Sequence, residues 1–145
     1  MRITEATNYK QQIEGLLTAE KLPSADLPLD LRNFRVAIEN DKVIGIAGIE
    51  IYGNYGLVRS LVTEPAYRGR GIAGKLLTEI EHTATVKNLK AVYLLTETAP
   101  EYFRARGYIQ IMRAEVPAEV QQSSEFSFVC PQSAVVMSKM LTDNK

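Results

Sequence analysis

The feature that most constrains this chain is a glycine-rich stretch at residues 67–74, with the sequence YRGRGIAG. It follows an apolar, strand-like run at residues 57–62 and leads into residues 71–87, where apolar side chains recur at helical spacing. Glycines let a backbone approach a ligand closely, and the unpaired N–H groups at the start of a helix attract anions. The order of strand, loop and helix therefore predicts a pyrophosphate cradle, to which Arg68 and Arg70 add positive charge.

Length and composition predict a single domain over residues 1–145, because 46% hydrophobic residues suffice for one core. The 17 basic and 17 acidic residues give a formal net charge of zero. No overall electrostatic field then attracts nucleic acid or an anionic membrane, and we expect neither as a partner.

The N-terminus lacks the pattern of a signal peptide, and no apolar run approaches the roughly 20 residues that cross a bilayer, so we expect a cytoplasmic protein. Cys130 is the only cysteine, which excludes an internal disulfide. We interpret it as a packing residue, since soft-metal sites gather several thiolates. His82 is the only histidine and falls on the polar side of the 71–87 pattern, so we expect a surface imidazole and no metal site.

The apolar patterns predict an α/β fold with a mixed, mostly antiparallel sheet of six or seven strands flanked by helices. The strand at 91–95 follows the helix at 71–87, so it should run parallel to the strand at 57–62. Residues 22–31, with two prolines, predict an irregular connection or a short helix. We expect the other strands at residues 2–7, 34–39, 42–52, 108–112 and 134–140, and further helices after Asn8, at 100–104 and at 117–122.

Turn chemistry refines these boundaries. Asn40-Asp41 predicts one hairpin turn, and residues 53–56 predict a second hairpin with a four-residue loop. Asn8 and Thr98 are expected to cap helices, the second of which ends at Gly107.

Two signatures in the sequence resemble those of the GCN5-related N-acetyltransferases, the GNAT superfamily. Residues 61–73, LVTEPAYRGRGIA, are similar to the acyl-CoA-binding motif of that family. Its specific elements are Arg68, Gly71 and Ala73. A second signature of the family is matched further along the chain by Ala99, Tyr102, Phe103, Gly107 and Tyr108.

A narrower resemblance is to the N-acetyltransferases of arsenic-resistance gene clusters. It is carried by residues 56–62, 93–96, 113–117 and 130–134. This likeness implies that the acceptor is the amino group of a toxic amino acid related to glutamate, and it raises a role in arsenic resistance.

The resemblance to the superfamily implies acetyl-CoA as cosubstrate, bound between central parallel strands that splay apart. Main-chain atoms of Leu61, Val62 and Thr63 would bind the pantetheine arm, which Thr96 would also contact. The resemblance places the pyrophosphate on a loop and helix start formed by Arg68, Gly69, Arg70, Gly71, Ile72, Ala73 and Gly74.

Acetyl transfer to an amine needs an oxyanion site and a proton for the leaving thiolate. The N–H of Val62 is our candidate for the oxyanion. Phe103 stands where many relatives have the tyrosine that protonates the thiolate, and Tyr102 is one residue earlier, about 100° away on a helix. Either Tyr102 reaches the sulfur, or the thiolate leaves unassisted or takes a proton from water, as a thiol of pKa about 8.5 allows.

Glu50 is the candidate base, because it is the only acid within residues 43–52. A four-residue loop at 53–56 would place Glu50 opposite Arg59 across the strands. The pair is either a structural ion pair or part of the acceptor site. In the second case Arg59, with Ser60 beside it, holds a substrate carboxylate or oxyanion, and Glu50 takes the amine proton directly or through water.

Together these features predict an N-acetyltransferase in which a small-molecule amine attacks directly, without an acyl-enzyme. A protein or peptide N-acetyltransferase and a non-catalytic acyl-CoA sensor stay open as alternatives, as does a homodimer.

Overall fold

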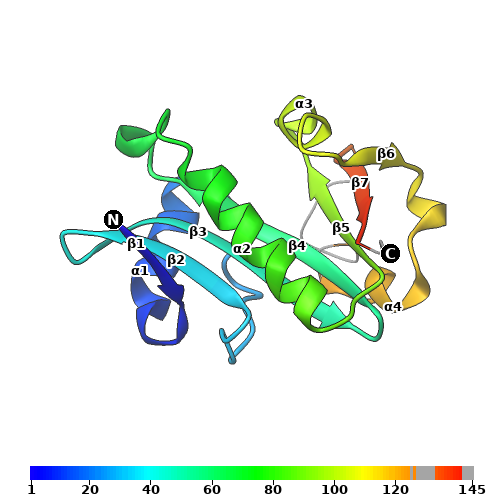
Figure 1. The fold of residues 1–145 in the computed structure, drawn as a ribbon, viewed down its shortest axis with the longest axis horizontal. Coiled ribbons are helices and arrows are strands. Elements are labelled where there is room, and N and C mark those ends of the chain that lie inside the picture. Colours follow the sequence, from blue (N-terminus) through cyan, green and yellow to red (C-terminus); the bar gives the residue numbers. More distant parts are fainter. Residues whose placement is uncertain (125, 127–132, 142–145) are drawn as a thin grey trace. The chain divides into compact units, whose positions relative to one another are not determined.

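The structure is a computed structural model that describes residues 1–124, 126 and 133–141 (Figure 1). The chain divides into two compact units. The first comprises Met1–Ile49 and Val58–Thr83, and the second comprises Glu50–Leu57 and Ala84–Lys145. The grouping of both units into one domain over residues 1–145 stays a prediction.

The described residues form a seven-stranded sheet in the order β1-β2-β3-β4-β5-β7-β6. β4 and β5 are parallel, from Tyr55 opposite Ala91 to Leu57 opposite Tyr93, whereas β1–β2, β2–β3, β5–β7 and β6–β7 are antiparallel. The predicted mixed, mostly antiparallel α/β sheet is thus confirmed, while the splaying of β4 from β5 stays a prediction. The strands are β1 Arg2–Glu5, β2 Phe34–Glu39, β3 Lys42–Tyr52, β4 Tyr55–Thr63, β5 Ala91–Thr96, β6 Ile109–Ile111 and β7 Val135–Met140, and the α-helices are α1 Lys10–Ala19, α2 Ile72–Val86, α3 Pro100–Arg104 and α4 Ala118–Gln121.

In the first unit, α1 and α2 cover opposite faces of the strands (Figure 1). α1 buries Ile13 and Leu17 in a cluster that includes Phe34 and Ile46. α2 packs on the other face at Gly45, where an added Cβ would lie 3.0 Å from Leu76 Cδ1. Neighbouring residues on a strand point to opposite faces, so Gly45 of β3 faces α2 and Ile46 faces α1. This packing fixes the start of α2, and with it the glycine-rich loop.

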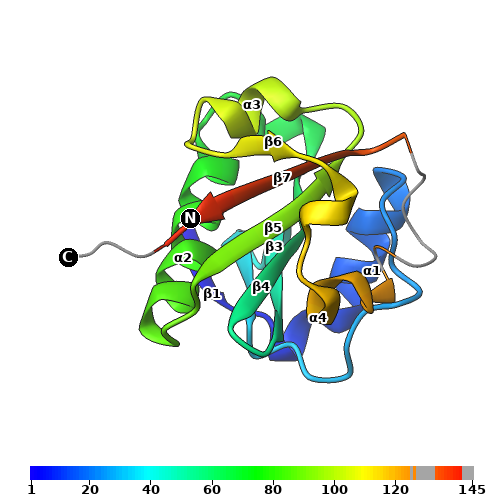
Figure 2. The ribbon, with the colours of Figure 1, turned by 90° about the vertical axis from the view of Figure 1, so that its right-hand side faces the viewer.

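In the second unit, β5 and β7 pair along their whole length, from Ala91 opposite Met140 to Thr96 opposite Val135 (Figure 2). β5 is also the partner of β4, so it has a strand on each side. Ala91, Val92, Tyr93 and Leu94 are all buried, so both faces of this part of β5 are covered, as predicted from its continuous apolar sequence. The core of this unit contains Leu57, Ala91, Tyr93, Val116, Val120, Phe126 and Val136.

Two predicted helix caps are wrong. Asn8 lies within a 3-10 helix, Thr7–Tyr9, that leads directly into α1, so the N-cap of α1 is Tyr9 without a side-chain bond. The N-cap of α3 is Ala99 and not Thr98. The Oγ1 of Thr96 accepts the N–H of Ala99 at 3.1 Å, which holds the residue before the helix, but α3 has no side-chain cap bond of its own.

The predicted four-residue loop at 53–56 is also wrong, because β4 already begins at Tyr55. The connection is the two-residue loop Gly53-Asn54, with Gly53 at φ +63°. Glycine with positive φ at the first central position is typical of a tight type II′ hairpin turn. The direct facing of Glu50 and Arg59, which depended on the longer loop, loses that basis, and an ion pair between them stays a prediction.

The remaining elements begin and end within about two residues of their predicted bounds. Residues 22–31 contain neither helix nor strand, so the predicted irregular connection is confirmed and the short helix is not. No helix among the described residues is long and apolar enough to cross a membrane. Cys130, which we interpret as a packing residue, lies outside the described residues.

Candidate active site

The loop between β4 and α2 belongs to the first unit and has two glycines with left-handed backbone. Gly69 has φ +86° and Gly71 has φ +75°. A Cβ added at either would meet no atom within 4 Å, so backbone conformation, not crowding, favours glycine there. α2 begins at Ile72, and the N–H groups of its first turn have no partners within the helix. Positive φ at two glycines and a helix start are backbone features that suit an anion, while anion binding by this loop stays a prediction.

Both arginines of this loop pair with carboxylates of the first unit. Arg68 Nη2 lies 2.7 Å from Glu20 Oε1, and its Nε donates to the carbonyl of Thr63 at 3.3 Å. Arg70 Nη1 lies 3.2 Å from Glu39 Oε2. Neither acid was predicted from the sequence, because they are 48 and 31 residues away from these arginines and no local pattern links them to the loop.

The end of β4 contains a buried hydroxyl without a partner. Thr63 is 7% exposed, and its Oγ1 makes no hydrogen bond with any described residue. Val62 is buried beside it and belongs to the core cluster of the first unit, while Leu61 is half-buried. Burying a hydroxyl without a hydrogen bond lowers the free energy of unfolding by about 1–3 kcal/mol. A bound ligand can provide the missing hydrogen bond.

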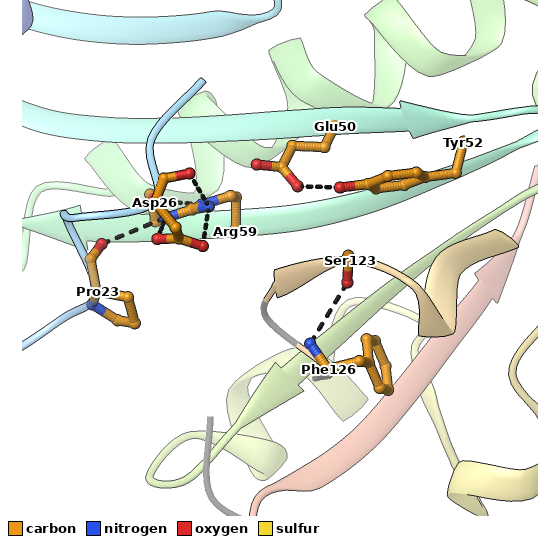
Figure 3. Close-up of polar contacts among 8 residues, drawn as sticks. Pro23, Asp26, Glu50, Tyr52, Arg59, Ser123 and Phe126 are labelled. Carbon is orange, nitrogen blue, oxygen red and sulfur yellow. Dashed lines mark hydrogen bonds and ion pairs between the residues drawn. The ribbon is translucent and has the colours of Figure 1, made fainter. Parts of the chain in front are cut away.

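Arg59 on β4 is bound by residues of an irregular segment of the first unit (Figure 3). Its Nη1 lies 2.8 Å from Asp26 Oδ2, and its Nη2 lies 2.9 Å from Asp26 Oδ1. Its Nε donates to the hydroxyl of Ser60 at 3.0 Å. The sequence analysis did not single out Asp26, because a lone acid in an irregular segment carries no signal of its own.

Glu50 accepts a hydrogen bond from the hydroxyl of Tyr52, at 2.6 Å, within the second unit (Figure 3). The two residues are next but one on β3, so they lie on the same face of the strand. Tyr52 also packs against the core of this unit. The bond holds one oxygen of the candidate base in place.

On α3, Phe103 and Tyr102 have different surroundings, also within the second unit. Phe103 is buried and packs edge-on against Tyr108, with 5.6 Å between the ring centroids. The Tyr102 hydroxyl is a buried atom that has no hydrogen-bond partner among the described residues. Phe103 is therefore a core residue, whereas Tyr102 has a buried hydroxyl that pairs with no described residue.

Lys42 and Tyr93 are two of the described ionisable groups whose pKa values are shifted. The hydrogen bond from Lys42 to Glu64 raises the pKa of the Lys42 ammonium, beside the start of the glycine-rich loop. Burial raises the pKa of the Tyr93 hydroxyl on β5, with a smaller contribution from Tyr55.

His82 is exposed on α2, as expected. No group of three or more His, Cys, Asp or Glu side chains that could hold a metal ion occurs within residues 1–124, 126 and 133–141.

Comparison with solved structures shows what this fold resembles. Rv2747 from Mycobacterium tuberculosis, solved in complex with CoA, is 24% identical with a TM-score of 0.82 over 98% of this chain and 100% of its own. A GNAT-family acetyltransferase from Staphylococcus aureus is 22% identical with a TM-score of 0.78, covering 97% and 99% of the two chains. N-acetylglutamate synthase from Neisseria gonorrhoeae, complexed with CoA and L-arginine, is 16% identical with a TM-score of 0.82, over 98% of this chain and 33% of its own.

Comparison with curated proteins finds no match. The sequence model of the acetyltransferase (GNAT) domain, in contrast, matches residues 30–110, more than half of the chain, including the glycine-rich loop and α3. Since that match agrees with the strand order and the loop geometry, the chain belongs to the GNAT family and is an acetyltransferase.

Proposed function

We propose that this acetyltransferase transfers an acetyl group from acetyl-CoA to the amino group of a small amino acid. The observation that carries the proposal is the loop before α2, where Gly69 and Gly71 with positive φ precede a helix start. This backbone suits a pyrophosphate. The fold is shared with Rv2747 and with N-acetylglutamate synthase from Neisseria gonorrhoeae, both solved with CoA, which supports the same cosubstrate here.

The residues at the end of β4 fit the pantetheine arm in their chemistry. The buried Thr63 hydroxyl has no partner among the described residues, so an amide of the arm can satisfy it. Leu61 and Val62 offer main-chain groups, and Arg68 and Arg70 offer positive charge once a phosphate competes with Glu20 and Glu39. Thr96 stays a candidate for contact with the arm, although its hydroxyl already accepts the N–H of Ala99.

Bound acetyl-CoA supplies an acetyl group activated as a thioester. Glu50, held by Tyr52, takes the proton of the attacking amine directly or through water. The N–H of Val62 donates to the oxygen that gains negative charge. The Tyr102 hydroxyl, which has no other partner among the described residues, gives its proton to the leaving sulfur. The chain would then need no acyl-enzyme.

The acceptor class follows from Arg59 and Ser60, which we assign to a carboxylate of the acceptor. The resemblance to arsenic-linked acetyltransferases points in the same direction, toward a glutamate-like toxic amino acid. This chain covers only 33% of the N-acetylglutamate synthase from Neisseria gonorrhoeae, so that likeness supports an amino acid acceptor as a class and nothing narrower.

The test combines calorimetry with an acceptor panel. We expect acetyl-CoA to bind in calorimetry and free thiol to appear only when an amino acid acceptor is present. Binding without acceptor-dependent thiol release from any amine would identify an acyl-CoA sensor. Release with peptide amines alone would identify a peptide acetyltransferase, and absence of acetyl-CoA binding would reject the proposal.

A further inference from the structure

The surroundings of Arg59 have the geometry of a carboxylate-binding site. Its two terminal nitrogens meet the two oxygens of Asp26 at 2.8 and 2.9 Å, a bidentate pair of the kind by which arginine recognises planar carboxylates (Figure 3). The Arg59 side chain is 0% exposed, and that of Asp26 is 14% exposed. The carboxylate thus lies on the outer side of the pair.

Ser60 fixes the direction of this guanidinium. Its hydroxyl accepts the Nε–H of Arg59, and its backbone has φ +62°, in the left-handed region that non-glycine residues rarely adopt. Strain of this kind inside a strand gathers at ligand sites, where surrounding structure maintains it. A structural ion pair by itself would not need a strained serine beside the arginine.

Asp26 belongs to a segment, residues 22–31, that has neither helix nor strand. The ends of the segment are held by backbone bonds, from the Leu22 N–H to the Leu17 carbonyl at 2.9 Å and from the Phe34 N–H to the Leu31 carbonyl at 3.0 Å. Between these ends, Leu29 is 93% exposed. Leu27 also packs against the core, and the Pro23 carbonyl accepts from Arg59 Nη2 at 3.3 Å, so the segment has further contacts on either side of Asp26. It has no helix or strand hydrogen bonds, however, that a movement of the Asp26 carboxylate would break.

We propose that Arg59 is the carboxylate site of the acceptor and that Asp26 occupies it until the acceptor carboxylate takes its place. This inference rests on the proposed function and adds a displaceable internal carboxylate to it. Exchange of one carboxylate for another leaves the buried guanidinium paired throughout, so the charge is never stranded. The released Asp26 becomes solvated, and an acceptor amine without a carboxylate gains nothing from the site.

The kinetic test uses Asp26→Asn with Asp30→Asn as matched control. Asp30 lies on the same segment and pairs with the exposed Arg32, so its loss removes a carboxylate without touching Arg59. We expect Asp26→Asn to lower the KM for L-glutamate at least threefold, because the internal competitor is weakened. The KM for L-glutamine amide, which has no carboxylate, should not change, and Asp30→Asn should change neither. A KM that rises, or that changes equally for both acceptors, would overturn the exchange.

A second measurement does not depend on turnover. In the wild-type protein, without acetyl-CoA so that no acetyl group can be transferred, L-glutamate should speed hydrogen exchange of backbone amides at residues 22–31, and L-glutamine amide should not. Unchanged or slower exchange with L-glutamate contradicts the displacement of Asp26. Because exchange can be followed with L-glutamate alone, it decides the role of Asp26 even if acetyl-CoA does not bind, the result that would reject the proposed function.

Discussion

At the scale of single residues, two buried hydroxyls are informative because they have no partner among the described residues. They belong to Thr63 at the end of β4 and to Tyr102 on α3. Folding alone does not explain them, since removing an unsatisfied buried polar group is neutral or stabilising. Thr63 lies in the stretch that the resemblance to GNAT enzymes assigns to the cosubstrate, and Tyr102 lies one residue before the position of the family's tyrosine, so we propose that a bound ligand pairs with each hydroxyl.

Thr63→Val tests whether the Thr63 hydroxyl contributes to folding or to ligand binding. Valine keeps the shape and removes the hydroxyl, so the free protein should be as stable as the wild type or about 1 kcal/mol more stable. Acetyl-CoA affinity should fall about three- to tenfold, because the arm loses one hydrogen bond. Thermal unfolding and calorimetry measure the two effects. Thr83→Val, which removes a hydroxyl bonded to the Glu79 carbonyl on α2, is the control that leaves affinity unchanged. A destabilised Thr63→Val with normal affinity would refute this assignment.

Glu50→Gln should lower kcat at neutral pH by about 100-fold, because an amide cannot accept the amine proton. The acetyl-CoA dissociation constant should stay within about twofold of the wild type, since binding and proton transfer use different residues. Steady-state kinetics and calorimetry on one preparation give both numbers.

Tyr52→Phe is the matched variant for this experiment. It leaves the carboxylate and removes the hydroxyl that donates the 2.6 Å hydrogen bond, so its kcat should fall between those of the wild type and Glu50→Gln. Unchanged turnover in Glu50→Gln would remove the base assignment.

At the scale of elements, apolar periodicity predicted most of the fold. The helix pattern before Val86 and the apolar run of β5 were recognisable because burial imposes a period on many residues at once. The hairpin loop and the helix caps were missed, since each depends on the backbone of one or two residues, such as Gly53 at φ +63°. Asp26 was missed for another reason: its bond to Arg59 spans 33 residues, and nothing local marks it.

Two glycines test this packing in opposite directions. Gly15 lies in the middle of α1 with no atom within 4 Å of an added Cβ, so Gly15→Ala should raise the free energy of unfolding by about 0.5–1 kcal/mol. At Gly48 on β3 an added Cβ would lie 2.3 Å from the Phe34 ring, so Gly48→Ala should lower the free energy of unfolding by about 1–3 kcal/mol. Urea unfolding of the two variants measures both. Equal effects would show that the contacts around Gly48 are not as described.

At the scale of the whole molecule, the boundaries between the two compact units fall inside continuous elements. Ile49 and Glu50 are neighbours within β3, Leu57 and Val58 within β4, and Thr83 and Ala84 within α2. One unit cannot unfold completely without breaking elements that continue into the other. We therefore expect the whole chain to unfold cooperatively.

We expect one calorimetric unfolding transition, with equal calorimetric and van't Hoff enthalpies, as for a two-state domain of this length. Acetyl-CoA at 100 times its dissociation constant should add about 2.7 kcal/mol to the free energy of unfolding. Two resolved transitions, of which only one responds to acetyl-CoA, would instead show independent units.

The same continuity of β3, β4 and α2 has a practical consequence for engineering. Fragments cut at Ile49, Leu57 or Thr83 would each end in the middle of a strand or helix, which makes these positions poor choices for split reporters or inserted tags. The turn at Asn40 and Asp41, which lies between β2 and β3 and is exposed at its tip, is the better place for a foreign sequence.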